Sequence, residues 1–567
     1  MSNESVFSKF ENQKTIDISN IDILKEEFDK LLDLDIKSVE ELKEFVEKRD
    51  VISKHLVNNW CETYFLMTTD VADEKKKKNN EFVDEFITPI ESEYGDKLDK
   101  KFLSSPYISE LGEDFDIYIT NLKRKTELFC EENIDVRKKI DKLSSEITEI
   151  QGKLLVDWEG KRVPPPEVYP HFKSTDREIR KRAYEAVLNA DLSVYEEINQ
   201  RFDELIQLRV QLAKNSKMES FTKYAFKDMQ RSDWDETHCF EFHKAVKEHI
   251  VPIHKKLRKK RKESLKLDKL RPYDLSVDYL GREPLYLYKK ENVEEFIEGT
   301  GKIIKAIDEE LYSFFKDIRE NDLLDLVSRE NKAPGGFMLM YPIYEKASVF
   351  YNGVGLASDL QVLLHELGHC FHYYLGKDVR PYALQDWCAE VAESGSMSME
   401  FIGLEHAQEY LSKEDCKRIK EDRLKGVVGL LVWCSQVDEF QHWLYANADH
   451  SQSEREDKWK ELRLEYGGDD VDMTGYLEKS AKVDWQFMHI LQMPFYYIDY
   501  AISEILALSV WDKYKEDPKN GLKYYKDGCR LAASKSVKEI YQAFGTTLSF
   551  GDEVLRPLAK RLEEELL

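Results

Sequence analysis

Glycine and proline, the residues that most often interrupt helices, are scarce in this sequence. The 567 residues include 24 glycines and 15 prolines, whereas average usage is about 7% and about 5%. Charged residues are frequent instead, at 34% of the chain against a usual share of about 25%. We therefore expect a mostly helical protein. Because the chain is too long for one compact core, we also expect two or more large lobes.

The sequence also shows no Cys-x-x-Cys pair and no long apolar run, and we expect no signal peptide. The eight cysteines are scattered, without a Cys-x-x-Cys pair, which disfavours a disulfide framework and predicts reduced thiols. Residues 1–11 lack the basic segment followed by an apolar segment that marks a signal peptide. The longest strongly apolar run, residues 427–434, is far too short to span a bilayer. We expect a cytoplasmic protein without a membrane partner.

An excess of basic residues is lacking as well, since the formal net charge is −25 at pH 7. This acidity disfavours nucleic acids and anionic membranes as partners. Residues 255–262 hold seven basic residues in eight positions, a pattern that would suit nucleic acid in a basic protein. In this acidic chain we interpret the run as a solvated helix face.

One marked break divides the helical pattern of the sequence. Gly152, the stretch from Asp157 to Gly160 and the three consecutive prolines at 164–166 interrupt the helical pattern. A new helix is expected from the capping box formed by Thr175 and Glu178. We therefore predict an N-terminal helical region over 1–165 and a catalytic region over 166–567.

A metal-binding pattern follows in the second region. His365 and His369 are four residues apart, so on a helix they share one face, with Cβ atoms about 5–6 Å apart. Both imidazoles can then reach one Zn²⁺ ion at about 2.0–2.1 Å. Glu366 lies beside them and can take a proton from a metal-activated water, as in metalloproteases.

The neighbourhood of these histidines predicts the helix that they need. Ser358 and Gln361 form a capping box, so a helix is expected from residue 359 to about Gly376. His372 lies about 10 Å from His365 along that helix, too far to complete the same tetrahedron. We interpret His372 as a packing residue or as a contact to a ligand.

A third ligand is expected from an acidic stretch that follows. Glu390, Glu393 and Glu400 fall at spacings of three and seven, so one helix would present all three on one face. Alanine, valine, methionine and glycine surround them, which is typical of a buried face. The spacing leaves open which glutamate binds the metal.

Two segments that precede the metal helix in the sequence are candidate β-strands. Residues 337–341 and 348–353 have a β-like composition and predict a small sheet just before the metal helix. Its free edge could pair with an extended peptide by strand addition, although a purely structural hairpin fits the sequence equally well.

The C-terminal part carries candidate donors for a negatively charged transition state. Pro494 suits the first turn of a helix, on which Tyr496 and Tyr500 would share a face while Tyr497 points about 100° away. With His489, these residues could stabilise an oxyanion, a contribution commonly worth about 2.7–4 kcal/mol. The alternative is a core helix whose tyrosine hydroxyls are hydrogen-bonded internally.

Together these residues resemble a known family. The run His-Glu-Leu-Gly-His-Cys-Phe-His at 365–372, followed by residues 389–400, looks like oligoendopeptidase F and thimet oligopeptidase, which belong to one family of zinc oligopeptidases. In that family the zinc glutamate precedes a second glutamate by seven residues. The resemblance therefore selects Glu393 as the ligand and leaves Glu390 and Glu400 as contacts to the ligands.

The resemblance covers the chain from about residue 170 to its end. Residues 350–353, 227–231 and 176–180 also look familiar, whereas the part before residue 150 matches only in being helical. Residues 394–396 differ from the thimet-type pattern and are closer to oligoendopeptidase F. The resemblance also matches His489, Tyr496 and Tyr500 to the family's donors and ranks Tyr497 second.

The resemblance implies a mostly helical fold of two lobes flanking a deep substrate channel, with a small β-sheet next to the zinc helix. It implies one Zn²⁺ per chain, Glu366 as general base, and peptide catabolism on short unstructured peptides. The implied metal ligands are His365, His369 and Glu393, and the implied catalytic residues are Glu366, His489, Tyr496, Tyr500 and Tyr497.

Two other functions compete with a zinc endopeptidase. An exopeptidase of the same fold, such as a carboxypeptidase or dipeptidyl carboxypeptidase, would need a group that captures a peptide terminus, and the sequence assigns no arginine or lysine to that task. An inactive helical binding protein would lack the base or a donor, yet Glu366, His489 and Tyr496 are all present. The joint pattern favours the active endopeptidase.

Overall fold

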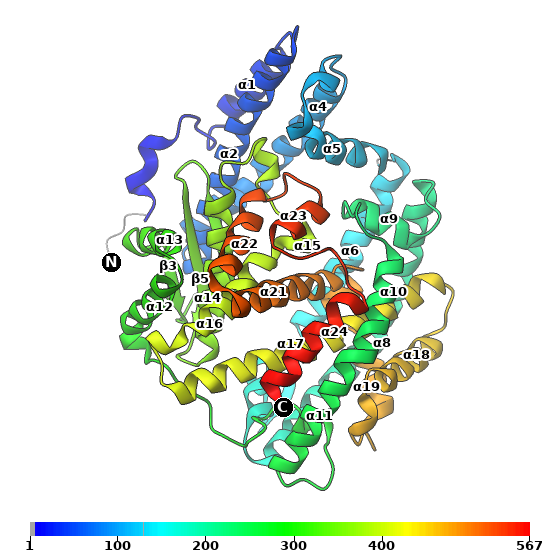
Figure 1. Cartoon of the computed structure of the whole chain (residues 1–567). Helices are drawn as coiled ribbons and strands as arrows, with labels where there is room; N and C mark the ends of the chain where they lie inside the picture. The colour runs from blue at the N-terminus through cyan, green and yellow to red at the C-terminus, as the bar shows by residue number, and fades with distance from the viewer. Residues whose placement is uncertain (1–5, 129) are drawn as a thin grey trace. The chain divides into compact units, whose positions relative to one another are not determined.

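A computed structural model describes residues 6–128 and 130–567, and these residues form a mostly helical protein with two small sheets (Figure 1). The expected helical fold is thus confirmed. The first five residues of the segment without signal-peptide character lie outside the described residues. In the part of the chain that is described, no helix has both the length and the apolar character needed to cross a bilayer.

The chain divides into two compact units, each built from three separate stretches. The first unit contains residues 1–123, 285–420 and 506–548, and the second contains 124–284, 421–505 and 549–567. The boundary expected after residue 165 falls inside the second unit, in the first turn of α7 (Pro165–Val168). That division of the sequence, and the channel between two lobes, stay predictions.

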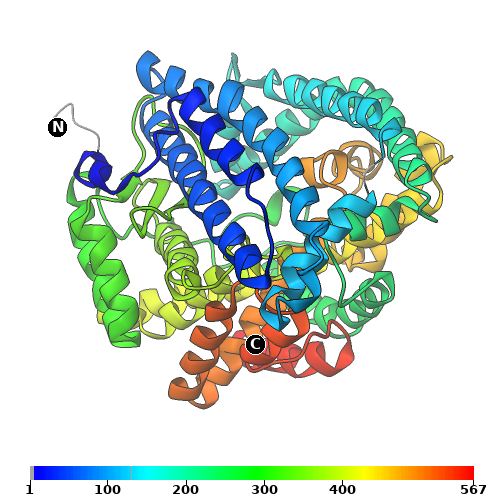
Figure 2. The same ribbon diagram turned by 90° about the horizontal axis from the view of Figure 1, so that it is seen from above.

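Helices make up most of the first unit, and its N-terminal helices α1, α2 and α4 lie side by side, as Figure 2 shows in blue. Asn20 caps α1 and Ser38 caps α2 through side-chain oxygens that accept backbone N–H groups. The helices are α1 (Ile21–Leu32), α2 (Val39–Thr69), α3 (Glu74–Phe82), α4 (Thr88–Leu103), α12 (Val293–Ile307), α13 (Glu309–Glu320), α14 (Ser358–Gly376), α15 (Ala389–Ala392), α16 (Ser394–Glu405), α22 (Pro518–Leu531) and α23 (Val537–Ala543).

A three-stranded sheet of the first unit lies against α14 (Figure 1). Its strands are β3 (Leu324–Val327), β4 (Gly336–Tyr341) and β5 (Lys346–Gly353), in the order β3-β5-β4. β4 pairs antiparallel with β5, from Gly336 opposite Tyr351 to Tyr341 opposite Lys346, and β3 pairs parallel with β5. The predicted small sheet is confirmed, and β4 is one of its edges. Asn352 and Gly353 form the end of β5.

The second unit is built around α8, against which α6 and α19 pack. Its helices are α6 (Glu132–Gly152), α7 (Pro165–Val168), α8 (Arg177–Asn215), α9 (Phe221–Asp228), α10 (Glu236–Ala245), α11 (Val251–Ser264), α18 (Gln452–Glu465), α19 (Leu477–Val483), α20 (Met488–Leu491) and α24 (Asp552–Leu566). Three more helices contain residues of both units: α5 (Asp116–Leu128), α17 (Lys413–Ala446) and α21 (Ile498–Glu516). A hairpin of β1 (Val156–Trp158) and β2 (Lys161–Val163) completes it.

Two local predictions for the second unit have different outcomes. The cap of α8 is Asp176, whose side chain accepts the N–H of Glu178, so the expected capping box at Thr175 is wrong. Asp176 caps α8 in place of Thr175 because it lies directly before the first helical residue and its carboxylate is a stronger hydrogen-bond acceptor than a hydroxyl. The basic run at 255–262 lies on α11 as a helix face, where Lys255 pairs with Asp469 at 2.7 Å and Arg258 with Asp470 at 2.9 Å.

Candidate metal centre

The helix α14 carries the two histidines of the metal-binding pattern and spans Ser358 to Gly376. Its end agrees with the prediction, but the expected cap by Ser358 is wrong. Asp359 instead holds the start of the helix, because its Oδ2 accepts the N–H groups of Val354 and Gly355 at 2.8 and 2.7 Å. This carboxylate ties the end of β5 to α14, a contact that a local motif search does not reveal.

Three predicted ligands meet at one point of the first unit. Glu393 Oε2 lies 3.1 Å from His365 Nε2 and 3.4 Å from His369 Nε2. Tetrahedral ligands at the Zn–N and Zn–O distances usual in proteins lie about 3.3 Å from one another. The donor set of two imidazoles and one carboxylate, at this spacing, therefore fits a zinc ion.

The glutamates come from two short helices rather than from the single helix that the spacing predicted. α15 ends at Ala392 and α16 begins at Ser394, with Glu393 at the junction (φ −90°, ψ −4°). The break separates the three carboxylates: Glu393 faces both Nε2 atoms, and Glu400 Oε1 lies 2.8 Å from His365 Nδ1. Glu390 is buried but is not part of the group of ligand atoms.

Small residues let α16 approach α14 closely enough to bring these carboxylates in. A Cβ atom on Gly368 would lie 2.5 Å from Ser396 Cα and 2.7 Å from the Gly395 carbonyl oxygen. Gly368 therefore has to be glycine for the two backbones to touch. No spacing rule marks Gly368 in the sequence, although it lies between the two histidines.

The pKa shifts of Glu366 and Glu393 have opposite directions, which suits Glu366 as a proton acceptor and Glu393 as an ionised ligand. Burial raises the pKa of Glu366, whose side chain is almost fully enclosed. Burial would lower the pKa of His365, but hydrogen bonds to Glu393 and Glu400 outweigh it and raise this pKa to about 10. Burial acts against the ionised form of Glu393 too, yet both histidines hold its pKa well below the ordinary value.

His372 packs in the core, as one of the two interpretations of the sequence proposed. Its ring stacks on Trp387 at 4.5 Å between centroids and an angle of 16°, and burial lowers its pKa to about 3. Trp387 also stacks on His369 at 5.5 Å. The indole of Trp387 thus packs against the ring of His369, a candidate ligand. The residue spacing did not indicate this contact.

The predicted donors form an aromatic cluster of their own in the second unit. The ring of His489 lies 4.7 Å from Tyr497, 5.6 Å from Tyr500 and 6.2 Å from Tyr496 between centroids. All three tyrosines therefore surround one imidazole. Burial lowers the pKa of His489, so its ring is neutral near pH 7.

The helix expected from Pro494 is wrong in its start. α21 begins at Ile498, and residues 494–497 form turns in which Phe495 has a φ of +66°. Phe495 is fully buried and its N–H donates to Gln441 Oε1 at 2.7 Å, a distant contact that holds the chain out of the helical region. Tyr497 consequently joins the cluster instead of pointing away from it.

Comparison with known proteins identifies the family. Residues 171–560 match the model of peptidase family M3, and residues 12–129 match that of the peptidase M3 N-terminal domain. The chain belongs to peptidase family M3. The resemblance to oligoendopeptidase F is thereby confirmed.

Individual relatives agree with this assignment. The chain is 21% identical over 328 residues to oligopeptidase PepF of Bacillus subtilis (strain 168), covering 57% of this chain and 47% of that protein. It is 23% identical over 408 residues to the chromosomal oligoendopeptidase F of Lactococcus lactis subsp. cremoris, covering 69% and 64%. The match thus spans about half to under two thirds of these relatives. A solved structure of PZ peptidase A with inhibitor 2 superposes with a TM-score of 0.84 at 27% identity, covering 98% of each chain.

Proposed function

We propose that this M3 peptidase is a zinc-dependent endopeptidase that cleaves short, unstructured oligopeptides. The observation that carries the proposal is the meeting of His365 Nε2, His369 Nε2 and Glu393 Oε2 within 4.8 Å of one another. A zinc ion held there supplies Lewis acidity, which lowers the pKa of a water towards about 7.

Glu366 is the proposed general base. It follows His365 directly on α14, so its carboxylate belongs to the same helix turn as the ligands. Its raised pKa suits a group that accepts a proton from water and later delivers that proton to the leaving amine. Glu400 has a positioning role, because its contact to Nδ1 fixes the ring of His365 with Nε2 towards Glu393.

The aromatic cluster of the second unit is proposed to stabilise the tetrahedral oxyanion. His489 and Tyr496 are the leading donors, with Tyr500 and Tyr497 beside them. A neutral imidazole and phenol hydroxyls can donate a hydrogen bond without adding charge. Burial lowers the pKa of His489 and raises that of Tyr497, which favours the neutral form of both groups.

The proposed substrate class is supported by one feature of the first unit. Among the described residues β4 is an edge strand of its sheet, so an extended peptide could pair with it by strand addition. Pairing of this kind recognises backbone rather than side chains and suits many short sequences. The eight free thiols favour a reducing compartment, which supports peptide turnover in the cytoplasm.

Digestion of a mixed peptide library, read by mass spectrometry, tests the proposal. The protein should cut short peptides at internal bonds, lose this activity in a chelator and regain it when Zn²⁺ is returned. Release of single residues or dipeptides from one end alone would identify an exopeptidase. Full zinc loading without any cleavage would identify a binding protein.

A further inference from the structure

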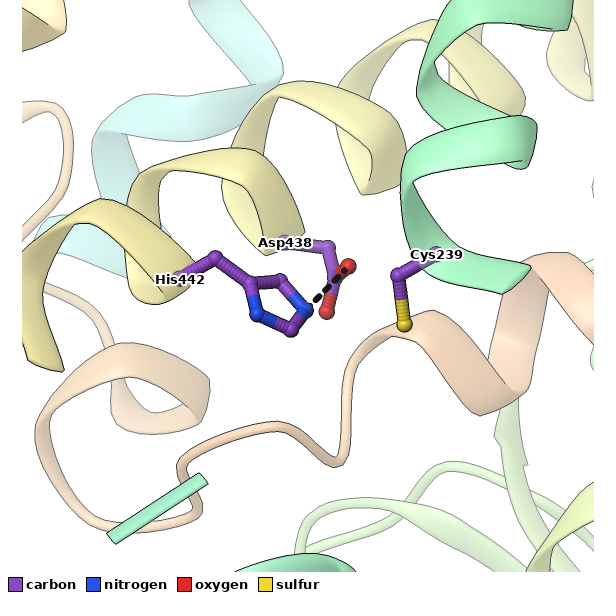
Figure 3. A group of neighbouring side chains, drawn as sticks. All are labelled: Cys239, Asp438 and His442. Carbon is purple, nitrogen blue, oxygen red and sulfur yellow. Dashed lines mark ion pairs between the residues drawn. The ribbon is translucent and has the colours of Figure 1, made fainter. Parts of the chain in front are cut away.

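A second group of metal-binding side chains lies in the second unit, apart from the residues discussed above. Cys239 lies on α10, while Asp438 and His442 lie four residues apart on α17. Figure 3 shows the three side chains approaching one another from these two helices. On each helix a spacing of four places residues on one face, and His243 follows Cys239 by four on α10.

The ligand atoms of this group are close together and sheltered from water. One atom each of Cys239, Asp438 and His442 lies within 4.8 Å of the others, and His442 Nε2 is 3.4 Å from Asp438 Oδ2. Cys239 and Asp438 are fully buried, and His442 is 7% exposed. The interior thus holds a thiol, a carboxylate and an imidazole that point at one small volume.

Two buried polar atoms of the group lack a hydrogen bond. Among the described residues, Asp438 Oδ1 has no hydrogen-bond partner, and His442 Nε2 makes no hydrogen bond beyond its 3.4 Å ion-pair contact to Asp438 Oδ2. A buried carboxylate oxygen or ring nitrogen left unsatisfied destabilises a folded interior, so such atoms normally bind a water or an ion. A carboxylate oxygen and the unprotonated nitrogen of a neutral imidazole can both bind a cation.

We propose that Cys239, Asp438 and His442 bind a second metal ion, of the Zn²⁺ class, that joins α10 to α17. Sulfur, nitrogen and oxygen donors in tetrahedral reach are typical of zinc, whereas calcium and magnesium prefer oxygen alone. A thiolate and a carboxylate together balance the two positive charges of the ion. Binding releases one proton, from the Cys239 thiol, to the solvent.

The surroundings support both the carboxylate and the thiolate. His243 Nε2 lies 2.8 Å from Asp438 Oδ2, so His243 is a positioning residue that holds the carboxylate in place. Burial and Asp438 raise the pKa of Cys239, while Arg231 lowers it. A divalent ion beside the sulfur would lower the pKa of Cys239, because a coordinated thiol is deprotonated.

An apolar shell and a surface pocket complete the site. The rings of Phe240 and Phe495 each lie 5.1 Å from the ring of His442, which keeps bulk water from the ligands. A pocket of about 520 Å³ lies beside the group and is lined by Phe240, His243 and Glu439 among others, but not by the three proposed ligands. Because the ligands are buried and come from two helices, the ion would cross-link α10 to α17.

Metal content measured by mass spectrometry tests the stoichiometry. The wild-type protein, zinc-loaded and dialysed against metal-free buffer, should hold two ions per chain. His442→Ala and His369→Ala should each hold one, and the double variant none. Cys434→Ala is the matched control, because Cys434 is equally buried on α17 but outside the ligand group, and it should keep two. A single ion in the wild type that His369→Ala removes would overturn the proposal.

Cobalt spectroscopy tests the ligand identity without depending on peptidase activity, and its first result comes from the wild-type protein. The group at His365 contains no thiol, so only the second site can give a thiolate-to-cobalt charge-transfer band. The wild type loaded with two equivalents of Co²⁺ should show this band, Cys239→Ala should lose it, and Glu393→Ala should keep it. His243→Gln should keep the band but bind Co²⁺ about 10–100-fold more weakly. No band in the wild type, or a band that survives Cys239→Ala, would show that Asp438 and its histidines form a metal-free ionic network.

Discussion

Glu366 illustrates how one residue's surroundings fit its proposed chemistry, since it is both next to a ligand and almost completely buried. Glu366→Gln keeps the shape of the side chain but cannot accept a proton. We expect unchanged zinc content and a fall in kcat of at least about 10²–10⁴-fold, measured with an internally quenched peptide. Retained hydrolysis would remove Glu366 from the role of base.

The glutamates at 390 and 393 differ in what they contact, although both are acidic residues of the same segment. Glu393→Ala removes an oxygen that faces both histidines, so zinc should dissociate at chelator concentrations that leave the wild type loaded. Glu390→Ala serves as the comparison, since Glu390 is buried outside the group, and it should keep zinc while lowering thermal stability. The reverse result would make Glu390 the ligand.

Tyr496 is proposed to act only when charge develops on the substrate. Tyr496→Phe should therefore lower kcat by about 10²–10³-fold with little change in KM, as for other oxyanion donors. Tyr497→Phe is the matched comparison from the same cluster and should have the smaller effect. A larger loss of kcat in Tyr497→Phe would transfer the leading role to that hydroxyl.

For single residues, the spacing of His365, Glu366 and His369 was sufficient to predict that they lie together on one turn of a helix, because a helix fixes which residues share a face. The choice of Glu393 came from family resemblance, since a regular helix would have treated Glu390 and Glu393 alike. The helix break that separates them has no proline or turn motif to mark it. Trp387 was missed because stacking on His372 joins residues from different elements.

At the scale of elements, the contact between α14 and α16 is set by Gly368. Gly368→Ala would place a methyl group against backbone atoms of α16, which cannot move aside as a flexible side chain could. We expect weaker zinc binding and a lower thermal midpoint, despite the higher helix propensity of alanine. The midpoint and the zinc affinity should be measured on the same preparation.

Gly426→Ala is the control for that change, because Gly426 lies in α17 with no atom within 4 Å of a Cβ. There alanine should raise the unfolding free energy by about 0.5–1 kcal/mol. A stabilised Gly368→Ala variant would contradict the close approach of the two helices.

Local patterns predicted elements better than their ends. The β4–β5 hairpin and α14 follow from residues near in sequence, and both are present. The cap at Thr175 was wrong because Asp176 accepts the N–H of Glu178 instead. The cap at Ser358 was wrong because the helix already begins at Ser358, and Asp359 holds the preceding N–H groups of Val354 and Gly355. The start of α21 depends on Gln441, a contact across more than fifty residues of chain, with |i−j| of 54.

At the scale of the whole molecule, the pH dependence of stability has a contribution from Asp50. Burial raises the pKa of Asp50 to about 6 from an ordinary value of 3.8. The folded protein therefore binds more protons than the unfolded chain between these values, so stability is lost as pH rises from about 4 to about 6. Relative to Asp50→Asn, the wild type should lose up to about 3 kcal/mol of unfolding free energy over this range.

Thermal midpoints of both proteins across this pH range test that prediction. The amide of the variant can still accept the N–H of Tyr382, which Asp50 Oδ2 accepts at 2.8 Å in the wild type. Asp141→Asn, at an exposed position, is the control and should follow the wild type. Parallel curves for wild type and Asp50→Asn would refute a raised pKa.

The division into two units could not be predicted from the sequence. Each unit joins stretches that are hundreds of residues apart, and such contacts leave no mark in composition or periodicity. The break near residue 165 is a real change in local pattern, yet it says nothing about which distant segments pack together.

This discontinuity also has a consequence for synthesis of the protein. Residues 506–548 complete the first unit and residues 549–567 complete the second. Helix α14 packs against α22 (Pro518–Leu531), so it leaves the ribosome well before its partner exists. At about 5–20 residues per second, α14 waits on the order of ten seconds or more with an apolar surface uncovered. The nascent chain should therefore depend on chaperones during this interval, and a stop codon near residue 500 would leave both units unable to close.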